Sequence, residues 1–370
     1  MAPKPGMWQP DMPEPDTDNA SPRVLQAIAG AAHGGAEAYF VRLCVALAGD
    51  GVTQRVVMRP NEARRRALEG AALSVAEAPF GGRLDLRTRK LIAAEIDAFK
   101  PDIVMSYMSR ASRFVPRSKS ERGYVTIGRL GGYYDLKYYR HLDHLVCNTR
   151  DLVDYVISEG WPMARAHFVP NFVLDHSEPA AARAPLRTPD DAPLIFALGR
   201  FHPNKAFDTL LRALADLPDH YLWLAGEGPQ RRALEDLADD LGVAGRLRFL
   251  GWRDDPAPYY AACDVFVLPS RHEPLGNVML EAWMHGRPVV ATESQGPCEL
   301  VESDSEAVLV PVDAPAALAA AIGDVTGDPE RAASLARAGR AAYERDYTQA
   351  IAVARHRALF DAVLKERHGR

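Results

Sequence analysis

Short apolar runs alternate with longer amphipathic segments along the first half of the chain. Segments with helical periodicity at 34–51, 85–99 and 149–159 separate runs rich in Val, Ile and Leu. Strands alternating with helices predict a parallel sheet covered on both faces. The predicted strands are 23–29, 54–58, 73–78, 102–107, 123–128 and 143–148.

The alternation stops in a Pro-, Ala- and Asp-rich stretch, predicted to be a linker at 171–192, and then restarts. Helices at 206–216 and 229–241 lie among the new strands, and 329–368 is helical but outside the sheet pattern. The predicted strands are 194–199, 221–228, 246–252, 264–270, 288–292 and 307–312.

The two halves predict an α/β protein of two Rossmann-like domains that face each other across a cleft. Ligands of such sheets bind at the carboxyl ends of the strands. The predicted parts are a disordered tail at 1–21, a first domain at 22–170, a second domain at 193–346, and a terminal helix at 347–370 that packs back on the first domain.

Composition narrows the function classes. The 370 residues are 47% hydrophobic and 25% charged with a net charge of -5, which argues against a dedicated nucleic-acid binder. The four cysteines are far apart and predict buried thiols rather than a metal site. The first twenty residues have no apolar core of a signal peptide, and no apolar run is long enough to span a bilayer. We expect a cytoplasmic protein.

Two cations follow the first strand of the second domain in "GRFHPNKAFDTL". Arg200 comes directly after the strand, and Lys205 precedes a helix. Arg grips phosphate oxygens as a fork and Lys acts as a point charge, so the pair suits a diphosphate. Two solvated cations near a helix start are the alternative. Gly226, at the end of the next strand, would let a nucleotide approach the backbone, although a simple turn explains it equally well.

Two carboxylates flank a Gly-Asn turn in "HEPLGNVMLEAWMHGRPVV". The backbone N–H groups at the start of the following helix form a phosphate site. Glu281, one turn into the helix, matches the vicinal hydroxyls of a ribose, and Glu273 reaches a second sugar. Each Glu alone could be a helix-start carboxylate favoured by the dipole. The backbone N–H groups of the predicted phosphate site are those of Gly276, Asn277 and Val278, at the start of that helix.

The stretch 264–300 resembles the nucleotide-sugar site of retaining glycosyltransferases of family 4, which have the GT-B fold. Glu273 and Glu281 match the acids of its E-x7-E motif, "GRFHPNKAFDTLLRAL" matches its Arg and Lys segment, and "GGAE" matches its Gly-rich turn. The resemblance implies that the second domain binds a nucleoside diphosphate sugar and the first an acceptor. Gly34 and Gly35 would then face the donor phosphate.

The implied mechanism is a front-face displacement in which the leaving phosphate accepts the acceptor's proton. It needs positioning and charge stabilisation, and no cofactor or metal is expected if Arg200 and Lys205 take the diphosphate charge. The one Asp-x-Asp, at 16–18, lies in the predicted tail. Where many relatives carry a His, this chain has Gly128 and Arg129, so Arg129 is a candidate charge in the cleft. His272 is a further candidate there.

The acceptor is indicated by charge. Residues 59–122 contain 14 Lys or Arg against 8 Asp or Glu, an excess of six that suits an anionic, lipid-linked acceptor and peripheral contact with the inner membrane. Solvated helix faces are the alternative. The whole pattern most resembles bacterial transferases that add mannose or a similar hexose to the lipopolysaccharide core from a GDP- or UDP-linked donor. Exopolysaccharide or glycolipid synthesis, a GT-B-like epimerase and a non-catalytic binder remain open.

Overall fold

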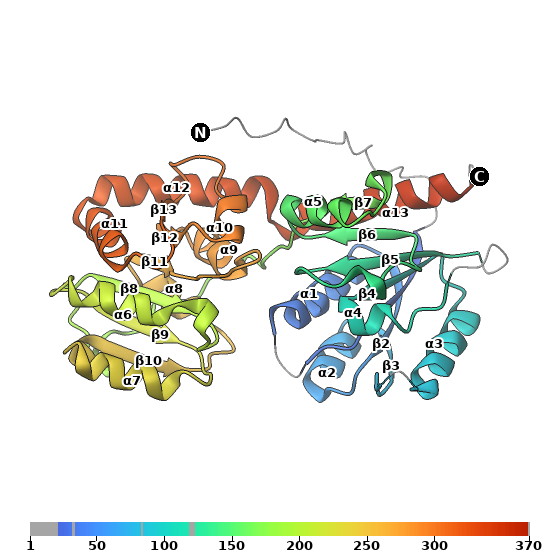
Figure 1. The fold of residues 1–370 in the computed structure, drawn as a ribbon, viewed down its shortest axis with the longest axis horizontal. Coiled ribbons are helices and arrows are strands. Elements are labelled where there is room, and N and C mark those ends of the chain that lie inside the picture. Colours follow the sequence, from blue (N-terminus) through green and yellow to red (C-terminus); the bar gives the residue numbers. More distant parts are fainter. Residues whose placement is uncertain (1–20, 32–33, 83, 118–122, 369–370) are drawn as a thin grey trace. The chain divides into compact units, whose positions relative to one another are not determined.

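The computed structural model describes residues 21–31, 34–82, 84–117 and 123–368, which form two compact units (Figure 1). The first unit contains the described residues up to Asn171 and the helix from Gln349 onward, and the second is Phe172–Thr348. Each unit is built on an open parallel sheet, so the predicted α/β class of two Rossmann-like parts is confirmed. Within the described chain, no helix is long and apolar enough to cross a membrane.

In its described part, the first unit has a seven-stranded sheet with the order β3-β2-β1-β4-β5-β6-β7. The strand order therefore reverses between β1 and β4. The strands are β1 Arg23–Ile28, β2 Thr53–Met58, β3 Ser74–Glu77, β4 Ile103–Tyr107, β5 Val125–Leu130, β6 His144–Cys147 and β7 Ala166–Phe168.

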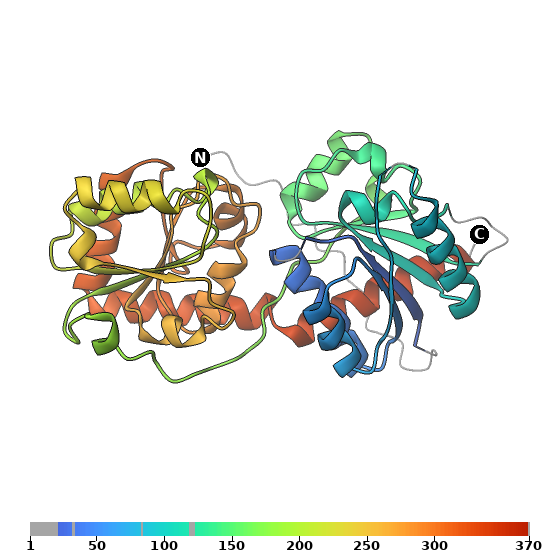
Figure 2. The same ribbon diagram turned by 90° about the horizontal axis from the view of Figure 1, so that it is seen from below.

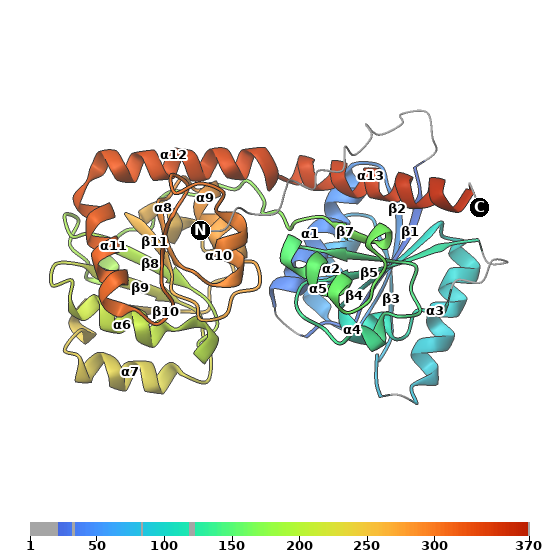
Figure 3. The same ribbon diagram turned by 45° about the horizontal axis from the view of Figure 1, so that its top comes forward.

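The helices of this unit follow the strands with local start signals. Asp85 caps the helix at 86–99 and Thr149 caps the helix at 150–158, each accepting a backbone N–H of the first turn. The C-terminal helix α13 runs beside the sheet (Figure 3), where Arg357 donates to Asp50 at 2.8 Å. The α-helices are α1 Gly35–Gly49, α2 Glu62–Gly70, α3 Leu86–Phe99, α4 Met108–Ser112, α5 Arg150–Ser158 and α13 Gln349–His368.

The second unit has a sheet of the order β10-β9-β8-β11-β12-β13, which reverses between β8 and β11. The strands are β8 Leu194–Leu198, β9 Tyr221–Ala225, β10 Leu247–Gly251, β11 Val265–Leu268, β12 Val289–Thr292 and β13 Val308–Val310. The α-helices are α6 Phe207–Ala215, α7 Arg231–Asp240, α8 Ala257–Ala262, α9 Asn277–Met284, α10 Gln295–Leu300, α11 Pro315–Gly327 and α12 Pro329–Asp346.

Alternate side chains of the second sheet enter two separate cores. Leu194 and Phe196 pack in one cluster with residues of α8, α9 and α12. Ile195 and Ala197 pack in the other with residues of α6, α7 and α11. The sheet thus lies between two helical layers, with α7 in yellow and α12 in red on opposite sides in Figure 2. Burial on both faces explains why the strands are continuous apolar runs.

Several short elements and one segment differ from the sequence prediction. The strand β7 and the helices α2, α4, α8, α10 and α11 were not among the predicted segments. The stretch predicted as a linker is held on the second unit: Ala181 N donates to Pro258 O at 2.8 Å, and Trp223 Nε1 donates to Thr188 Oγ1 at 2.9 Å. The predicted tail, with its Asp-x-Asp at 16–18, lies outside the described residues apart from Ser21.

Candidate nucleotide-sugar site

The candidate residues of the second unit follow two neighbouring strands. Arg200 and Lys205 come after β8, and Glu273 comes after β11, which pairs with β8 in parallel. The helices that follow these two strands cover opposite faces of the sheet, so this is the point where the strand order reverses. Open α/β sheets bind ligands at that point, outside the carboxyl ends of the strands.

Lys205 and Glu273 form an ion pair at the carboxyl ends of β8 and β11. Nζ of Lys205 donates to Oε2 of Glu273, which also accepts from Ser270 Oγ at 3.3 Å. Only 11% of the Glu273 side chain and 23% of the Lys205 side chain are exposed. An ammonium group carries three N–H donors, so Lys205 can hold this carboxylate and a phosphate oxygen together. The two residues singled out from the sequence are therefore in contact.

Arg271 fixes the loop that carries Glu273. Its guanidinium donates to both carboxylate oxygens of Asp208, at 2.9 and 2.7 Å, and lies 2.6 Å from Asp313. Its backbone N–H donates to Asn204 O at 2.8 Å. Burial alone would raise the pKa of Asp208, but the hydrogen bonds and charge of Arg271 lower it. Arg271 was not predicted from the sequence, because its partners Asp208 and Asp313 are distant along the chain.

Arg200 and His272 occupy different surroundings at the same edge. Arg200 is exposed and makes no hydrogen bond or ion pair within the part of the chain that the structure describes. Its charge is thus available to a ligand. His272 is half-buried, and its backbone N–H donates to Asn204 O at 3.2 Å. This contact places His272 in the loop that Arg271 fixes.

The helix α9 begins at the candidate phosphate-binding turn. Gly276, its N-cap, has φ 92°, a left-handed conformation that favours glycine. Within the described residues no side chain caps this helix. Five of its residues are buried, whereas Asn277, Val278 and Glu281 are half-exposed. Asn277 and Glu281 are one turn apart on the same face, and helical side chains lean toward the N-terminus. Glu281 therefore extends toward the turn.

Gly226 allows two strand-end loops to touch. At φ 128°, a Cβ on Gly226 would lie 1.9 Å from the carbonyl oxygen of Gly199. The backbone bond from Gly199 N to Ala225 O, at 3.0 Å, joins the same loops. The structure thus gives Gly226 a packing role, and the role in donor binding remains a prediction.

In the first unit, a carboxylate lies in the Gly-rich turn between β1 and α1. A Cβ on Gly34 would lie 2.3 Å from Oε2 of the buried Glu37, whose other oxygen accepts from Ala31 N at 2.7 Å. Arg64 donates to Ala31 O at 2.8 Å beside it. Gly35 is exposed at the first position of α1. The sequence pattern predicted a role for the glycines but not for the carboxylate of Glu37 that they accommodate.

Arg129 has three partners inside the first unit. Its guanidinium donates to Val169 O at 3.2 Å and Asn171 Oδ1 at 2.7 Å, and lies 4.3 Å from the ring centroid of Tyr39. The residue is 4% exposed, so its charge stabilises the end of β5. At Gly128, a Cβ would lie 2.8 Å from Leu142, which explains why a larger side chain does not fit there.

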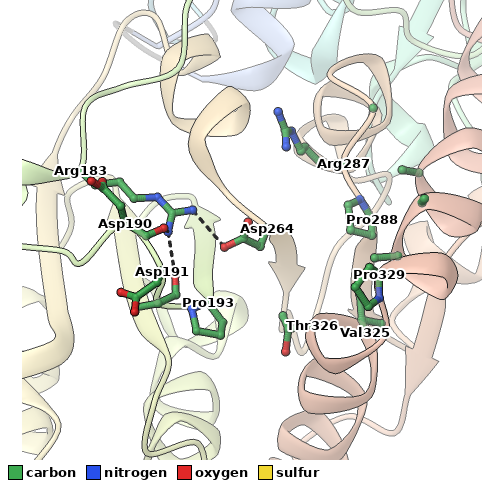
Figure 4. A pocket seen from close by; sticks show the side chains of 15 residues that line it. Arg183, Asp190, Asp191, Pro193, Asp264, Arg287, Pro288, Val325, Thr326 and Pro329 are labelled. Carbon is green, nitrogen blue, oxygen red and sulfur yellow. Dashed lines mark hydrogen bonds and ion pairs between the residues drawn. The ribbon is translucent and has the colours of Figure 1, made fainter.

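A pocket of about 470 Å³ lies at the amino-terminal ends of the strands of the second sheet, opposite the candidate site (Figure 4). Pro193, Asp264 and Pro288, which line it, directly precede β8, β11 and β12. Arg183 donates to Asp264 there at 3.0 Å. A group of metal-binding residue types, His176, Glu178 and Asp255, is exposed and joined by contacts of 3.4 and 3.5 Å. Neither feature includes the candidate residues.

The fold defines an α/β protein of two Rossmann-like units, with the charged candidate residues at the switch point of its second sheet. Residues 192–328 match the model of the family described as glycosyl transferases group 1. The chain is 42% identical to the lipopolysaccharide core biosynthesis glycosyltransferase LpsE of Rhizobium meliloti (strain 1021), over 83% of this chain and 89% of LpsE. It is 37% identical to LpsD of the same strain, over 90% of this chain and 97% of LpsD. The chain therefore belongs to the group 1 glycosyltransferases.

The fold is similar to that of solved glycosyltransferases of the GT-B class. The crystal structure of Anabaena HepE in complex with UDP and glucose matches 92% of this chain and all of HepE, with a TM-score of 0.79 and 20% identity. The predicted GT-B fold and glycosyltransferase class are thus confirmed.

Proposed function

We propose that this chain is a retaining hexosyltransferase that moves a mannose- or glucose-type sugar from a GDP- or UDP-linked donor to a lipopolysaccharide core. The placement of two cations and two carboxylates around the β8/β11 switch point carries the proposal. The similarity to LpsE and LpsD along most of the chain supports the choice of acceptor. The crystal structure of HepE contains UDP and glucose, which supports a nucleotide sugar as donor for this fold.

Each candidate residue has one role in the proposed donor complex. Arg200 and Lys205 neutralise the diphosphate, together with the backbone N–H groups at the start of α9. Glu281 accepts hydrogen bonds from the ribose hydroxyls. Glu273, already held by Lys205, accepts from the hydroxyls of the donor sugar and orients its anomeric carbon.

The proposed step breaks the bond between the anomeric carbon and the phosphate oxygen and forms a bond to the acceptor hydroxyl on the same face. The departing phosphate accepts the hydroxyl proton, so no protein base is required. Positive charge on Arg200 and Lys205 stabilises the leaving diphosphate as its charge develops. We expect transfer to proceed with a chelator present.

The acceptor side of the proposal rests on charge. The basic excess in residues 59–122 favours an anionic, lipid-linked glycan and peripheral contact with an anionic membrane. We expect the reaction on the cytoplasmic side of the inner membrane.

The test is a thermal-shift screen against UDP, GDP, ADP and their sugar conjugates with EDTA, followed by a product assay with core oligosaccharide. A ligand that binds only the folded state raises the melting temperature. A thermal shift with GDP-mannose alone would identify a mannosyl donor. A shift with a UDP-hexose would change the proposed donor but keep the proposed site. Transfer only to other lipid or polymer acceptors would favour exopolysaccharide or glycolipid synthesis. Conversion of the nucleotide sugar without transfer to an acceptor would favour an epimerase. Binding of the nucleotide sugar without any turnover would favour a non-catalytic binding protein. No shift with any of them would overturn the proposal.

A further inference from the structure

The basic residues of 59–122 fall in three tracts, at 64–66, 87–90 and 109–119. The described parts of these tracts differ in how much charge they expose. In the tract on α2, Arg64 is buried. Its neighbours are paired: Arg65 contacts Glu62 at 2.7 Å and Glu69 at 3.0 Å, and Arg66 contacts Glu62 at 2.8 Å. This tract is therefore largely neutralised by its own helix.

The other two tracts meet at the turn that leads into α3. Arg113, after α4, donates to Gly81 O at 3.1 Å. The guanidinium groups of Arg113 and Arg89 lie 4.9 and 5.5 Å from the ring centroid of the buried Phe114. In the described parts of 81–90 and 109–117, Asp85 is the only acid. Their charges therefore accumulate on one surface.

Two leucines project from the same turn. Leu84 is 92% exposed and Leu86 63%, the two highest values among the large exposed apolar residues of the described chain. Leu86 shares a face of α3 with Arg89 and Lys90, three and four residues on. These cations are exposed, as is Arg87.

The turn holds these leucines outward by its own hydrogen bonds. Asp85 accepts from Thr88 N at 3.0 Å, Thr88 Oγ1 at 2.6 Å and Gly81 N at 2.7 Å. Phe80 N donates to Thr88 Oγ1 at 2.9 Å. The side-chain and backbone hydrogen bonds from Thr88 lower the pKa of Asp85 to about 2. The carboxylate of Asp85 is thus engaged in capping α3, next to the two exposed leucines.

We propose that this surface, made of Leu84, Leu86, Arg87, Arg89, Lys90 and Arg113, docks on an anionic lipid bilayer. The leucines enter the boundary between headgroups and acyl chains, and the cations contact the anionic headgroups. Charge complementarity decides the occupant, because a surface of two leucines amid cations fits a negatively charged interface. The proposal deepens the membrane contact of the proposed function and locates it on one turn.

The test is cosedimentation of the full chain with vesicles of phosphatidylcholine, with and without phosphatidylglycerol. Leu84→Ser with Leu86→Ser should lower the partition coefficient on anionic vesicles about tenfold. Arg87→Gln should lower it about fivefold. Met163→Ser, which removes a side chain from another exposed apolar position of the first unit, and Arg66→Gln, which removes a paired cation, are the matched controls and should change little.

The proposal would be overturned if the leucine double variant bound anionic vesicles as well as the wild type does, or if the control variants lost as much binding as the surface variants. It would also be overturned if the wild type bound neutral and anionic vesicles equally well. A dimer in sedimentation velocity that the double variant loses would assign the surface to a second copy instead. The vesicles contain no glycan acceptor, so failure of sugar transfer would not affect this result. Loss of transfer to a soluble saccharide in the double variant would place the leucines in the acceptor site and also overturn it.

Discussion

The hydroxyl of Tyr260 lies 3.2 Å from Oε2 of Glu281 and 3.0 Å from the backbone oxygen of Val278. Burial and the neighbouring carboxylate raise the pKa of Tyr260 well above its usual value, so the hydroxyl stays a donor. The ring stacks on His285 at 5.1 Å and meets Phe196 edge-on at 5.0 Å. The fold therefore orients one carboxylate oxygen of Glu281, the residue proposed to bind the ribose, before the donor binds.

Tyr260→Phe should weaken binding of the nucleoside diphosphate that the thermal-shift screen identifies about three- to tenfold, because Glu281 loses the hydrogen bond that orients it. Calorimetric titration measures this. Tyr259→Phe is the matched control, since the hydroxyl of this neighbour on α8 makes no hydrogen bond within the described residues. In a Glu281→Ala background, Tyr260→Phe should add no further loss of affinity. A full additional loss there would show that Tyr260 does not act through Glu281.

Glu273→Gln should lower kcat about ten- to a hundredfold while changing the donor KM little, because the carboxylate is proposed to orient the sugar in the transition state. Initial-rate kinetics with varied donor separate the two constants. Glu293→Gln removes an exposed carboxylate after β12, at the same edge of the sheet, and should leave both constants unchanged. Equal effects of the two substitutions would remove Glu273 from the site.

Arg200→Ala and Lys205→Ala should both weaken binding of the nucleoside diphosphate that the thermal-shift screen identifies and leave binding of the corresponding nucleoside unchanged, because each variant loses a phosphate contact. Their effects on stability should differ. Arg200 is exposed and pairs with no described residue, so its loss should not change the melting temperature. Lys205→Ala leaves Glu273 without its cation and should lower the free energy of unfolding by about 1–3 kcal/mol. Thermal denaturation of both variants without ligand would contradict this if the two melted alike.

The sequence predicted the sheet elements well, since buried parallel strands are long apolar runs and glycines punctuate them. It missed short elements that carry little apolar pattern. In α2 only Arg64 and Leu68 are buried, so the helix has a charged sequence with little apolar periodicity. The strand β7 is three residues long and pairs only with β6. Such elements leave little pattern in the chain.

The candidate site was predictable where spacing in one segment encodes it, as for Glu273 and Glu281. The groups that hold those residues were not. Arg271 fixes its loop through Asp208, 63 residues away, and Tyr260 reaches Glu281 from the preceding helix. Such contacts depend on how strands are ordered in the sheet, which residue spacing does not reveal.

His356 should make the protein less stable in mild acid. It is fully buried on α13, where its Nδ1 lies 2.7 Å from Ala352 O, and burial, reinforced by Arg129, lowers its pKa to about 3. In the unfolded chain a histidine has a pKa of about 6.5. Below that pH the unfolded state gains a proton that the native state does not. Stability therefore falls by roughly 1.4 kcal/mol per pH unit from this residue as the pH drops toward 3.

The check on His356 is urea denaturation at several pH values between 7 and 5. His356→Leu should flatten the dependence of the unfolding free energy on pH by about one proton. His176→Gln, at an exposed position, should leave the slope as in the wild type. Burial also lowers the pKa values of His167 and His285, each to about 4, so part of the slope should persist in His356→Leu. An unchanged slope in His356→Leu would mean that this histidine is protonated in the native state.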